Sequence, residues 1–130
     1  MTKQNHIESA QCKALEKWRE YQECAWPELA WLFHIPNGGN RTALQGAILK
    51  AEGVKAGVWD YHLPVSRKGS TGLWIEMKAE GREKEKNGGL TDKQEKFGNF
   101  VRSQGAKTNV CYTAQEAIDV INAYLRMPKQ

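Results

Sequence analysis

The sequence predicts an α/β fold in which helices pack on a mixed β-sheet. Segments with a helical apolar period alternate along the chain with short segments in which every second residue is apolar. Glycine- and proline-containing turns separate these segments, and capping-box spacings precede the two last helical segments. The expected order is helix, strand, helix, strand, strand, helix, strand, helix. With 130 residues and no internal repeat, the chain is expected to form one domain over residues 1–130.

Composition narrows the class of protein only a little. The formal net charge of +4 is compatible with a polyanionic partner such as nucleic acid, but does not identify one. No apolar run is long enough to span a membrane, and the polar N-terminus lacks the apolar core of a signal peptide, so a cytoplasmic protein is expected. Cys12, Cys24 and Cys111 are odd in number and scattered, which argues against a disulfide framework. No CxxC or HxxxH spacing supports a zinc site.

A first amphipathic helix is predicted from residue 5 to about residue 25. Asn5 and Glu8 have the spacing of a capping box, which favours Glu8 as a helix cap. The alternative is that Glu8 is an acidic ligand at the edge of the apolar stripe. The stripe expected to face the core is Ile7, Ala10, Ala14, Leu15, Trp18, Tyr21 and Ala25.

Residues 29–35 are expected to be extended, and the glycine-rich turn at 36–40 leads to a short helix over residues 41–52. His34, Asn37 and Arg41 surround this turn, a pattern that can bind a phosphate, although most such turns only reverse the chain. The apolar residues of the short helix expected to face inward are Leu44, Ala47, Ile48 and Ala51.

Residues 57–65 and 71–78 are predicted to form an antiparallel hairpin centred on Lys68. In the symmetric register, Asp60 lies opposite Glu76, and Lys78 lies on the same face. Opposed carboxylates repel each other, so a cation, and specifically a divalent metal with oxygen ligands, is expected between them. The other face is apolar and is expected to be core: Trp59, Tyr61, Leu63, Val65, Leu73, Ile75 and Met77.

The charged segment 79–89 is expected to be an exposed, mobile loop. It follows Lys78 directly, so it either lies against a bound substrate or is a solvated linker. Residues 91–104 are predicted to form a helix capped by Thr91 and Gln94, with Phe97, Phe100 and Val101 inward.

A strand over residues 107–112 precedes a last helix capped by Thr113 and Glu116 and ended by Pro128. The residues of this helix expected to face inward are Ala117, Ile118, Ile121, Tyr124 and Leu125.

An aspartate opposite a Glu-x-Lys strand suits metal-assisted phosphodiester hydrolysis. Asp60 and Glu76 would hold Mg²⁺ or Mn²⁺, which polarises the scissile phosphate and activates a water. Lys78 would orient that water or stabilise charge on the phosphoryl oxygens. As a bare pattern D…ExK is short and occurs by chance, but its placement across one hairpin strengthens it.

The segments PELAWLFHIPNGGNR, GVKAGVWDYHLP, GLWIEMKAE and GGLTDKQEKF resemble the stand-alone VRR-NUC domain of the PD-(D/E)xK nuclease superfamily, of phage or bacterial type. The resemblance covers residues 8 to 125. It implies a restriction-endonuclease-like mixed sheet flanked by helices. One departure is that the family usually has proline before the aspartate, where this chain has Trp59, which by parity is expected to point toward the core.

The resemblance also implies roles for particular residues. The acidic residue of the family's first helix, in an E-x-x-Q pattern, corresponds to Glu8 with Gln11, which shifts Glu8 from helix cap to active-site residue. The family's glutamine after the Gly-Gly-Leu loop corresponds to Gln94, expected to support the lysine or the attacking water. The expected catalytic set is Glu8, Asp60, Glu76, Lys78 and Gln94, and the expected metal ligands are Asp60, Glu76, the backbone carbonyl of Met77 and also Glu8.

The implied activity is that of a structure-specific DNA endonuclease which resolves four-way (Holliday) junctions as a homodimer. The alternatives are a monomeric flap or nicking nuclease, and a non-catalytic nucleic-acid-binding module on a nuclease fold. The region of Trp26 and Trp31 is the expected apolar contact between subunits. The residues expected to contact DNA are His34, Asn37, Arg41, Lys55, Arg82 and Lys84.

Overall fold

The computed structural model describes residues 3–36 and 41–130, and within the first helix it describes side chains from residue 8 onward. A four-stranded sheet has the strand order β1-β2-β3-β4. Its strands are β1 (Phe33–His34), β2 (Tyr61–Leu63), β3 (Leu73–Met77) and β4 (Lys107–Cys111). The first three strands are antiparallel, and β4 is parallel to β3. The helices are α1 (Lys3–Gln22), α2 (Ala43–Ala51), α3 (Asp92–Ser103) and α4 (Ala114–Leu125), so the predicted order and fold class are confirmed.

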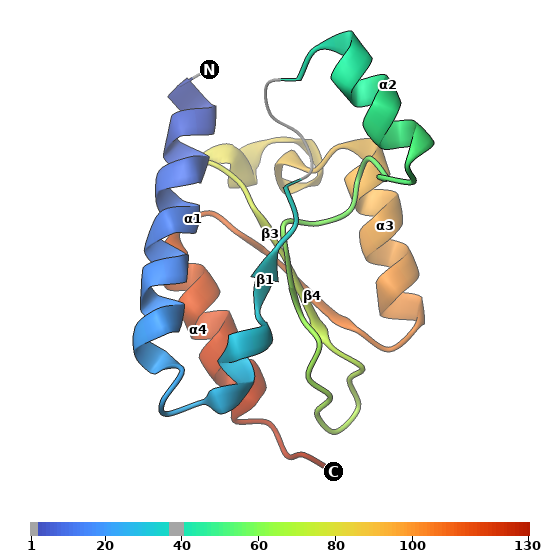
Figure 1. The fold of residues 1–130 in the computed structure, drawn as a ribbon. Helices are drawn as coiled ribbons and strands as arrows, with labels where there is room; N and C mark the ends of the chain where they lie inside the picture. The colour runs from blue at the N-terminus through green and yellow to red at the C-terminus, as the bar shows by residue number, and fades with distance from the viewer. Residues whose placement is uncertain (1–2, 37–40) are drawn as a thin grey trace.

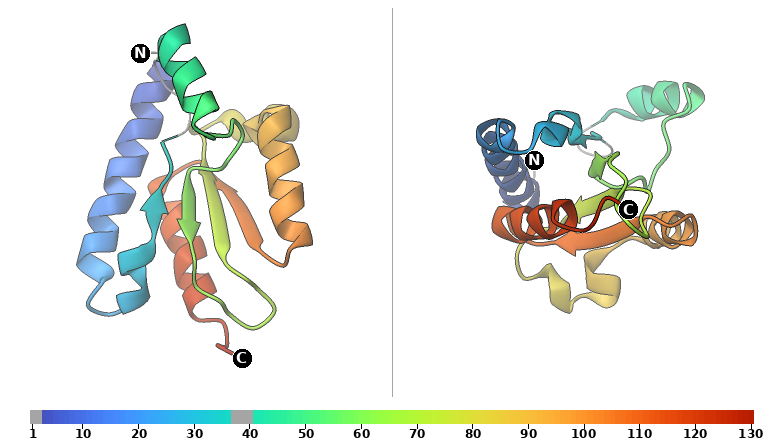
Figure 2. Two further views of the ribbon diagram at one scale, coloured as in Figure 1. Left: turned by 45° about the vertical axis from the view of Figure 1, so that its right-hand side comes forward. Right: turned by 90° about the horizontal axis from the view of Figure 1, so that it is seen from below.

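The helices form layers on the two faces of the sheet. α1 and α4 pack together on one face, and α3 covers the other (Figure 1; Figure 2). α2 stands apart at the end of the sheet toward which β3 runs (Figure 1). None of the helices in the described part of the chain is long and apolar enough to cross a membrane.

The hairpin has the predicted register. Tyr61 pairs with Ile75 and Leu63 with Leu73. The odd-numbered side chains of both strands are buried and pack against Leu15 of α1 and Ile121 of α4, as their alternation predicts. The tight turn pairs Arg67 with Ser70, which leaves one extra residue on the first arm between the turn and the paired strands.

The opposite face of the sheet carries aromatic rings. His62 stacks on Trp74 with ring centroids 3.9 Å apart, and Phe97 of α3 meets Trp74 edge-on. Trp59 is buried, but it packs against α3 and not with the apolar residues of the α1–α4 side. Its Nε1 donates to the Gln94 carbonyl, and a Cβ at Gly98 would lie 2.7 Å from its indole. The parity argument fails here because β2 begins only at Tyr61, so the strand alternation does not reach Trp59.

The expected stripe of α1 is partly wrong. Leu15 is buried and Trp18 half-buried, but Ala10, Ala14, Tyr21 and Ala25 are exposed. The face turned inward runs instead through Gln11, Cys12 and Leu15, and at its start it is polar. The helix already contains Asn5, so the Asn5–Glu8 capping box is also wrong.

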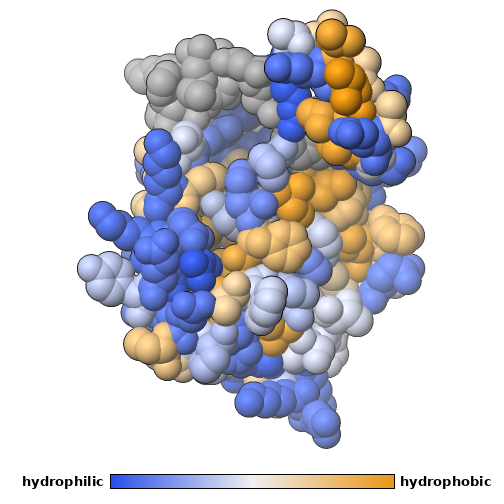
Figure 3. Space-filling view, viewed as in Figure 1, coloured by the Kyte–Doolittle hydropathy of each residue, from blue (hydrophilic) through white to orange (hydrophobic). Residues whose placement is uncertain are grey.

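The second helix does not face the core. Its Leu44 and Ile48 are 70% and 50% exposed, and none of its residues is buried, contrary to the prediction. The space-filling view shows apolar residues at the surface over α2 (Figure 3). α2 therefore lies at the end of the sheet and away from the core, a placement that periodicity does not reveal.

Three further local predictions need correction. Phe100 of α3 is 62% exposed and not inward. Within the stretch 29–35, residues 29–31 belong to a 3₁₀ turn, Pro27–Trp31, and the predicted strand is confirmed only at Phe33–His34. Segment 79–89 is largely exposed, as predicted, but it contains local structure: a 3₁₀ turn over Arg82–Lys84, a turn over Lys86–Gly89 with positive φ at Asn87 and Gly88, and a hydrogen bond from the Tyr112 hydroxyl to the Gly88 carbonyl at 2.7 Å.

A buried arginine fastens the hairpin turn to the helical layer. Arg67 is 5% exposed; its guanidinium donates to the Leu125 carbonyl (3.2 Å) and to a carboxylate oxygen of Glu28 (2.8 Å). These contacts join three segments that are distant in sequence: the turn, the end of α4 and the 3₁₀ turn after α1.

We predict that Arg67→Ala lowers the free energy of unfolding by roughly 2–3 kcal/mol, because it leaves a buried carbonyl without its donor and separates a largely buried ion pair. Urea unfolding followed by circular dichroism measures the change. Lys68→Ala is the matched control, because Lys68 is exposed, and should alter stability by less than about 0.5 kcal/mol. Equal losses of stability in the two variants would contradict the assigned role.

Candidate active site

Asp60 and Glu76 hold each other's strands through reciprocal hydrogen bonds. The Asp60 amide donates to Glu76 Oε1 at 3.1 Å, and the Met77 amide donates to Asp60 Oδ2 at 2.8 Å. The hairpin register therefore places the two carboxylates opposite each other, as the sequence predicts. Each carboxylate is oriented by the backbone of the other strand.

Lys78 and Gln94 complete this cluster. Lys78 Nζ donates to Gln94 Oε1 at 2.9 Å and lies 3.4 Å from Glu76 Oε2. Gln94 Nε2 donates to the same Glu76 oxygen at 2.8 Å. The amide of Gln94 thus binds both the acid and the base of the Glu-x-Lys pair. The predicted support of the lysine by Gln94 is present in the structure.

Gln94 is at the same time the cap of α3. Its Oε1 accepts from the Thr91 amide at 2.9 Å, while the Thr91 hydroxyl accepts from the Gln94 amide at 3.1 Å. The capping box predicted from the sequence is confirmed. One residue therefore both starts the helix and positions the lysine, and the start of α3 is fixed relative to β3.

Glu8 reaches the site from α1. Its carboxylate accepts from the Ala79 amide at 3.2 Å and lies 3.5 Å from the Arg82 guanidinium. It is therefore turned toward the end of β3 and not toward its own helix terminus, as the resemblance implied. Gln11, one turn along, accepts from the Ala114 amide at 2.6 Å and so caps the start of α4. The E-x-x-Q pair joins α1 to two other elements.

Two acidic side chains lie close together in this cluster and are partly removed from solvent, which raises the pKa of both. Burial, and then the nearby charge of Asp60, raises the pKa of Glu76 to about 8. Burial also raises the pKa of Asp60, opposed by the Met77 amide and by the charge of His34. His34 Nδ1 lies 3.0 Å from the Asp60 carbonyl oxygen, so this predicted DNA-contacting residue is in the site's immediate surroundings.

The carboxylate oxygens of Asp60 and Glu76 suit a hard divalent cation such as Mg²⁺ better than a metal that is fully enclosed by protein ligands. Among the described residues, no three His, Cys, Asp or Glu side chains converge on one point. Glu8 therefore does not join Asp60 and Glu76 in a three-carboxylate cage. Mg²⁺ commonly binds through one or two carboxylates and keeps several waters, which leaves positions for a phosphate. The repulsion between the buried Glu76 and the half-buried Asp60 carboxylates is the feature that a cation would relieve.

The other predicted DNA-contacting residues are scattered. Arg82 is engaged by Glu85 as well as by Glu8, so it ties segment 79–89 to α1. Lys84 is exposed on that segment. Arg41 donates to the Pro36 carbonyl and, with Lys55, lines a surface pocket beside α2. Asn37 lies outside the described residues. The sequence reasoning missed Lys50 and Lys93 of the same pocket, because no motif links residues from two helices.

The paired carboxylates lie on a hairpin of a mixed sheet, with a lysine two residues along and helices on both faces. A solved VRR_NUC domain protein superposes with a TM-score of 0.77 over 95% of this chain and 91% of that one, at 23% sequence identity. The chain therefore has the VRR-NUC domain fold, as the resemblance of its motifs implied. No protein-family model and no curated protein sequence matches the chain.

The raised pKa of Glu76 has a consequence for the metal-free protein. The pKa of an ordinary glutamate is 4.5, below the value of about 8 in the folded state, so the folded protein binds an extra proton between these values. We predict that the free energy of unfolding falls as the pH rises from about 4.5 to 8, and that Glu76→Gln loses this part of the slope. Thermal unfolding in EDTA over this pH range measures it.

Because other groups also titrate in this range, the difference between wild type and Glu76→Gln is the decisive quantity. Glu80→Gln is the matched control, since Glu80 is exposed, and it should keep the wild-type slope. Parallel stability curves for wild type and Glu76→Gln would show that the buried carboxyl is not held protonated by the fold.

Proposed function

We propose that the protein is a metal-dependent endodeoxyribonuclease that resolves four-way DNA junctions as a homodimer. The observation that carries the catalytic part is the Asp60–Glu76 pair with Lys78 held beside it by Gln94. The likeness in fold to a VRR_NUC domain protein supports it. The net charge of +4 is of the sign required to bind a polyanion.

We assign the metal to Mg²⁺ or Mn²⁺, held by the carboxylates of Asp60 and Glu76 and by the Met77 carbonyl. When bound, such a cation polarises the scissile phosphate as a Lewis acid. Glu8 acts from beside this set; its contact with the Ala79 amide orients the end of β3 that carries Lys78.

Lys78 stabilises negative charge that develops on the phosphoryl oxygens and orients the attacking water. Its side chain is 8% exposed, so its charge is screened less than that of a surface lysine. Gln94 limits the positions that the flexible lysine stem can adopt, and preorganisation of this kind is where a protein site gains most over water.

The substrate and the oligomeric state form the second part of the proposal. Cutting two strands of a junction requires two active sites, which a symmetric dimer supplies. Trp31 is 69% exposed, which supports a subunit contact in its region, whereas Trp26 packs against the core. Leu44 and Ile48 of α2 are further exposed apolar residues that a partner subunit could cover.

We predict that the protein cleaves a synthetic four-way junction in Mg²⁺ or Mn²⁺ and that EDTA abolishes cleavage. Asp60→Asn, Glu76→Gln and Lys78→Met should each lower the single-turnover rate by roughly 10²-fold or more, because the first two remove a proposed metal-binding carboxylate and the third removes the ammonium group. Denaturing gels of end-labelled strands measure the rate. Junction binding without cleavage in either metal would instead indicate a non-catalytic binding module.

The dimer makes a separate prediction. Light scattering should give twice the mass of one chain, and the paired cuts should lie at symmetric positions on opposing junction arms. A monomer that cleaves flaps or nicks single strands would contradict the junction-resolving assignment and leave the nuclease assignment in place.

The positioning role of Gln94 is tested apart from its role in the helix. Gln94→Ala should lower the single-turnover rate by about 10–100-fold with DNA binding unchanged, as loss of a group that orients an active-site residue does. Thr91→Ala is the matched control, because it also removes a partner of the capping box but leaves the contacts of Gln94 with Lys78 and Glu76. Equal rate reductions in the two variants would assign the effect to the helix cap.

A further inference from the structure

A basic surface pocket lies beside the candidate active site. A pocket of about 490 Å³ opens between α2, the segment that follows it and the start of α3. Four cationic residues, Arg41, Lys50, Lys55 and Lys93, line it together with apolar atoms of Leu49 and Val54. None of the described residues that line the pocket is acidic.

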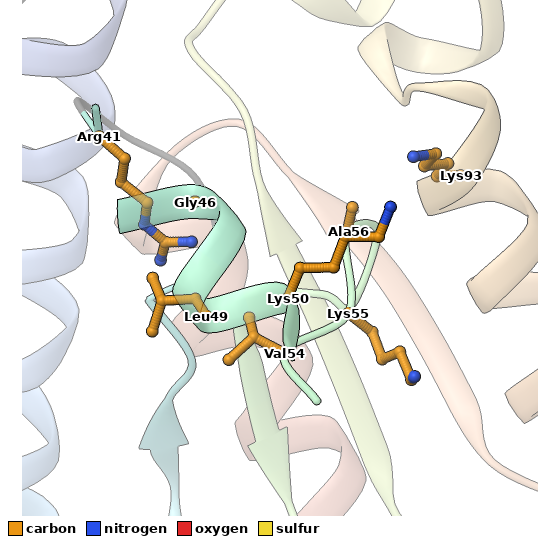
Figure 4. Close-up of a pocket in the computed structure, with 8 residues that line it drawn as sticks. All are labelled: Arg41, Gly46, Leu49, Lys50, Val54, Lys55, Ala56 and Lys93. Carbon is orange, nitrogen blue, oxygen red and sulfur yellow. The ribbon is translucent and has the colours of Figure 1, made fainter. Parts of the chain in front are cut away.

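Two of the cations that line the pocket, Lys50 and Lys93, have no acidic partner among the described residues. Both side chains are exposed. Figure 4 shows the Lys50 side chain extending toward α3, and the Lys93 ammonium group pointing back toward α2, whereas Lys55 points away. Two unpaired ammonium groups directed into one surface depression suit an anion that bridges them.

The pocket has a fixed place relative to the active site. Lys93 lines the pocket, and the next residue, Gln94, holds Lys78 and Glu76. The chain between α2 and β2 packs tightly on the same helical turn, because a Cβ at Gly57 would lie 2.7 Å from backbone atoms of Lys93. Gly57 also has a φ of +93°, which favours glycine. An anion bound in this pocket would therefore have a fixed position relative to a phosphate bound at Asp60 and Glu76.

We propose that this pocket binds backbone phosphates of the DNA arm that leaves the cleavage site, with Lys50 and Lys93 as the principal contacts. The inference rests on the proposed nuclease function and extends it to substrate positioning. Most of the lining side chains are exposed, so the pocket would not enclose a small molecule, whose sites bury most of the ligand. A long polyanion that crosses the surface needs no enclosure, and phosphate contacts of this type position a duplex without reading its sequence.

The first test measures binding in the absence of cleavage. A fluorescent four-way junction is titrated with protein in EDTA at several salt concentrations. Lys50→Gln/Lys93→Gln should weaken binding and reduce the slope of log affinity against log salt by about 2, close to one unit for each phosphate that is no longer neutralised. The matched control is Lys68→Gln/Lys129→Gln, which removes the same charge from the hairpin turn and the C-terminus, at the opposite end of the molecule (Figure 1). This control should keep the wild-type slope.

A second pair of variants separates charge from folding. Gly46 lies in α2 and lines the pocket, and a Cβ there would meet no atom within 4 Å, so a side chain can be added without a clash. Gly46→Glu should place a carboxylate beside the lysines and weaken binding at least 10-fold relative to Gly46→Gln, which has the same shape and no charge. Equal thermal melting of the two variants confirms that both are folded.

The outcomes distinguish this inference from the nuclease proposal. The pocket assignment alone would be overturned if wild type cleaved the junction and the pocket variants had the affinity and the salt dependence of wild type. Wild type that binds but does not cleave, with weakened pocket variants, would support the pocket and overturn the nuclease. If inorganic phosphate at low millimolar concentration abolished junction binding to wild type and to Lys50→Gln/Lys93→Gln equally, the pocket would not be the site of the contact.

Discussion

The structure depends most on the pairing of two carboxylates across one hairpin. Asp60 and Glu76 repel each other and are largely shielded from water, which is unfavourable for both in their charged forms. Each is nevertheless held by an amide from the other side of the hairpin, so the backbone keeps together two acidic groups that repel each other when both are ionised. The proximity of these two acids destabilises the folded state, as is common at binding and catalytic sites.

The other elements keep this unfavourable pair in place. The apolar face of the same two strands is buried against α1 and α4, so the carboxylates cannot turn away without exposing the core. On the other face α3 begins with a capping box whose glutamine also binds Lys78 and Glu76. Trp59 donates a hydrogen bond to the Gln94 carbonyl and so ties α3 to the segment that leads through Asp60 into β2. The core, one helix start and the charged cluster are therefore a single cooperative unit.

The basic pocket lies near the Asp60–Glu76 cluster because of where α2 is placed in the fold. α2 does not bury its apolar residues, so the core is not what holds it; the close approach of Gly57 to Lys93 anchors the segment that follows it. This leaves α2 at the end of the sheet where β3 delivers Lys78 (Figure 1). Because α2 contributes no buried residue to the core, its side chains are free to form a surface, and that surface includes the cations of the pocket.

The sequence by itself determined the order of elements, the hairpin register and the opposition of Asp60 and Glu76, because strand alternation and turn position are local properties. It also determined the caps at Thr91 and Thr113, which are set within four residues. Only the tertiary structure decided that the Glu8 carboxylate meets the Ala79 amide, that Trp59 turns to α3, and that α2 stays exposed. Those outcomes depend on which distant segment a side chain meets, and periodicity along one segment contains no information about that.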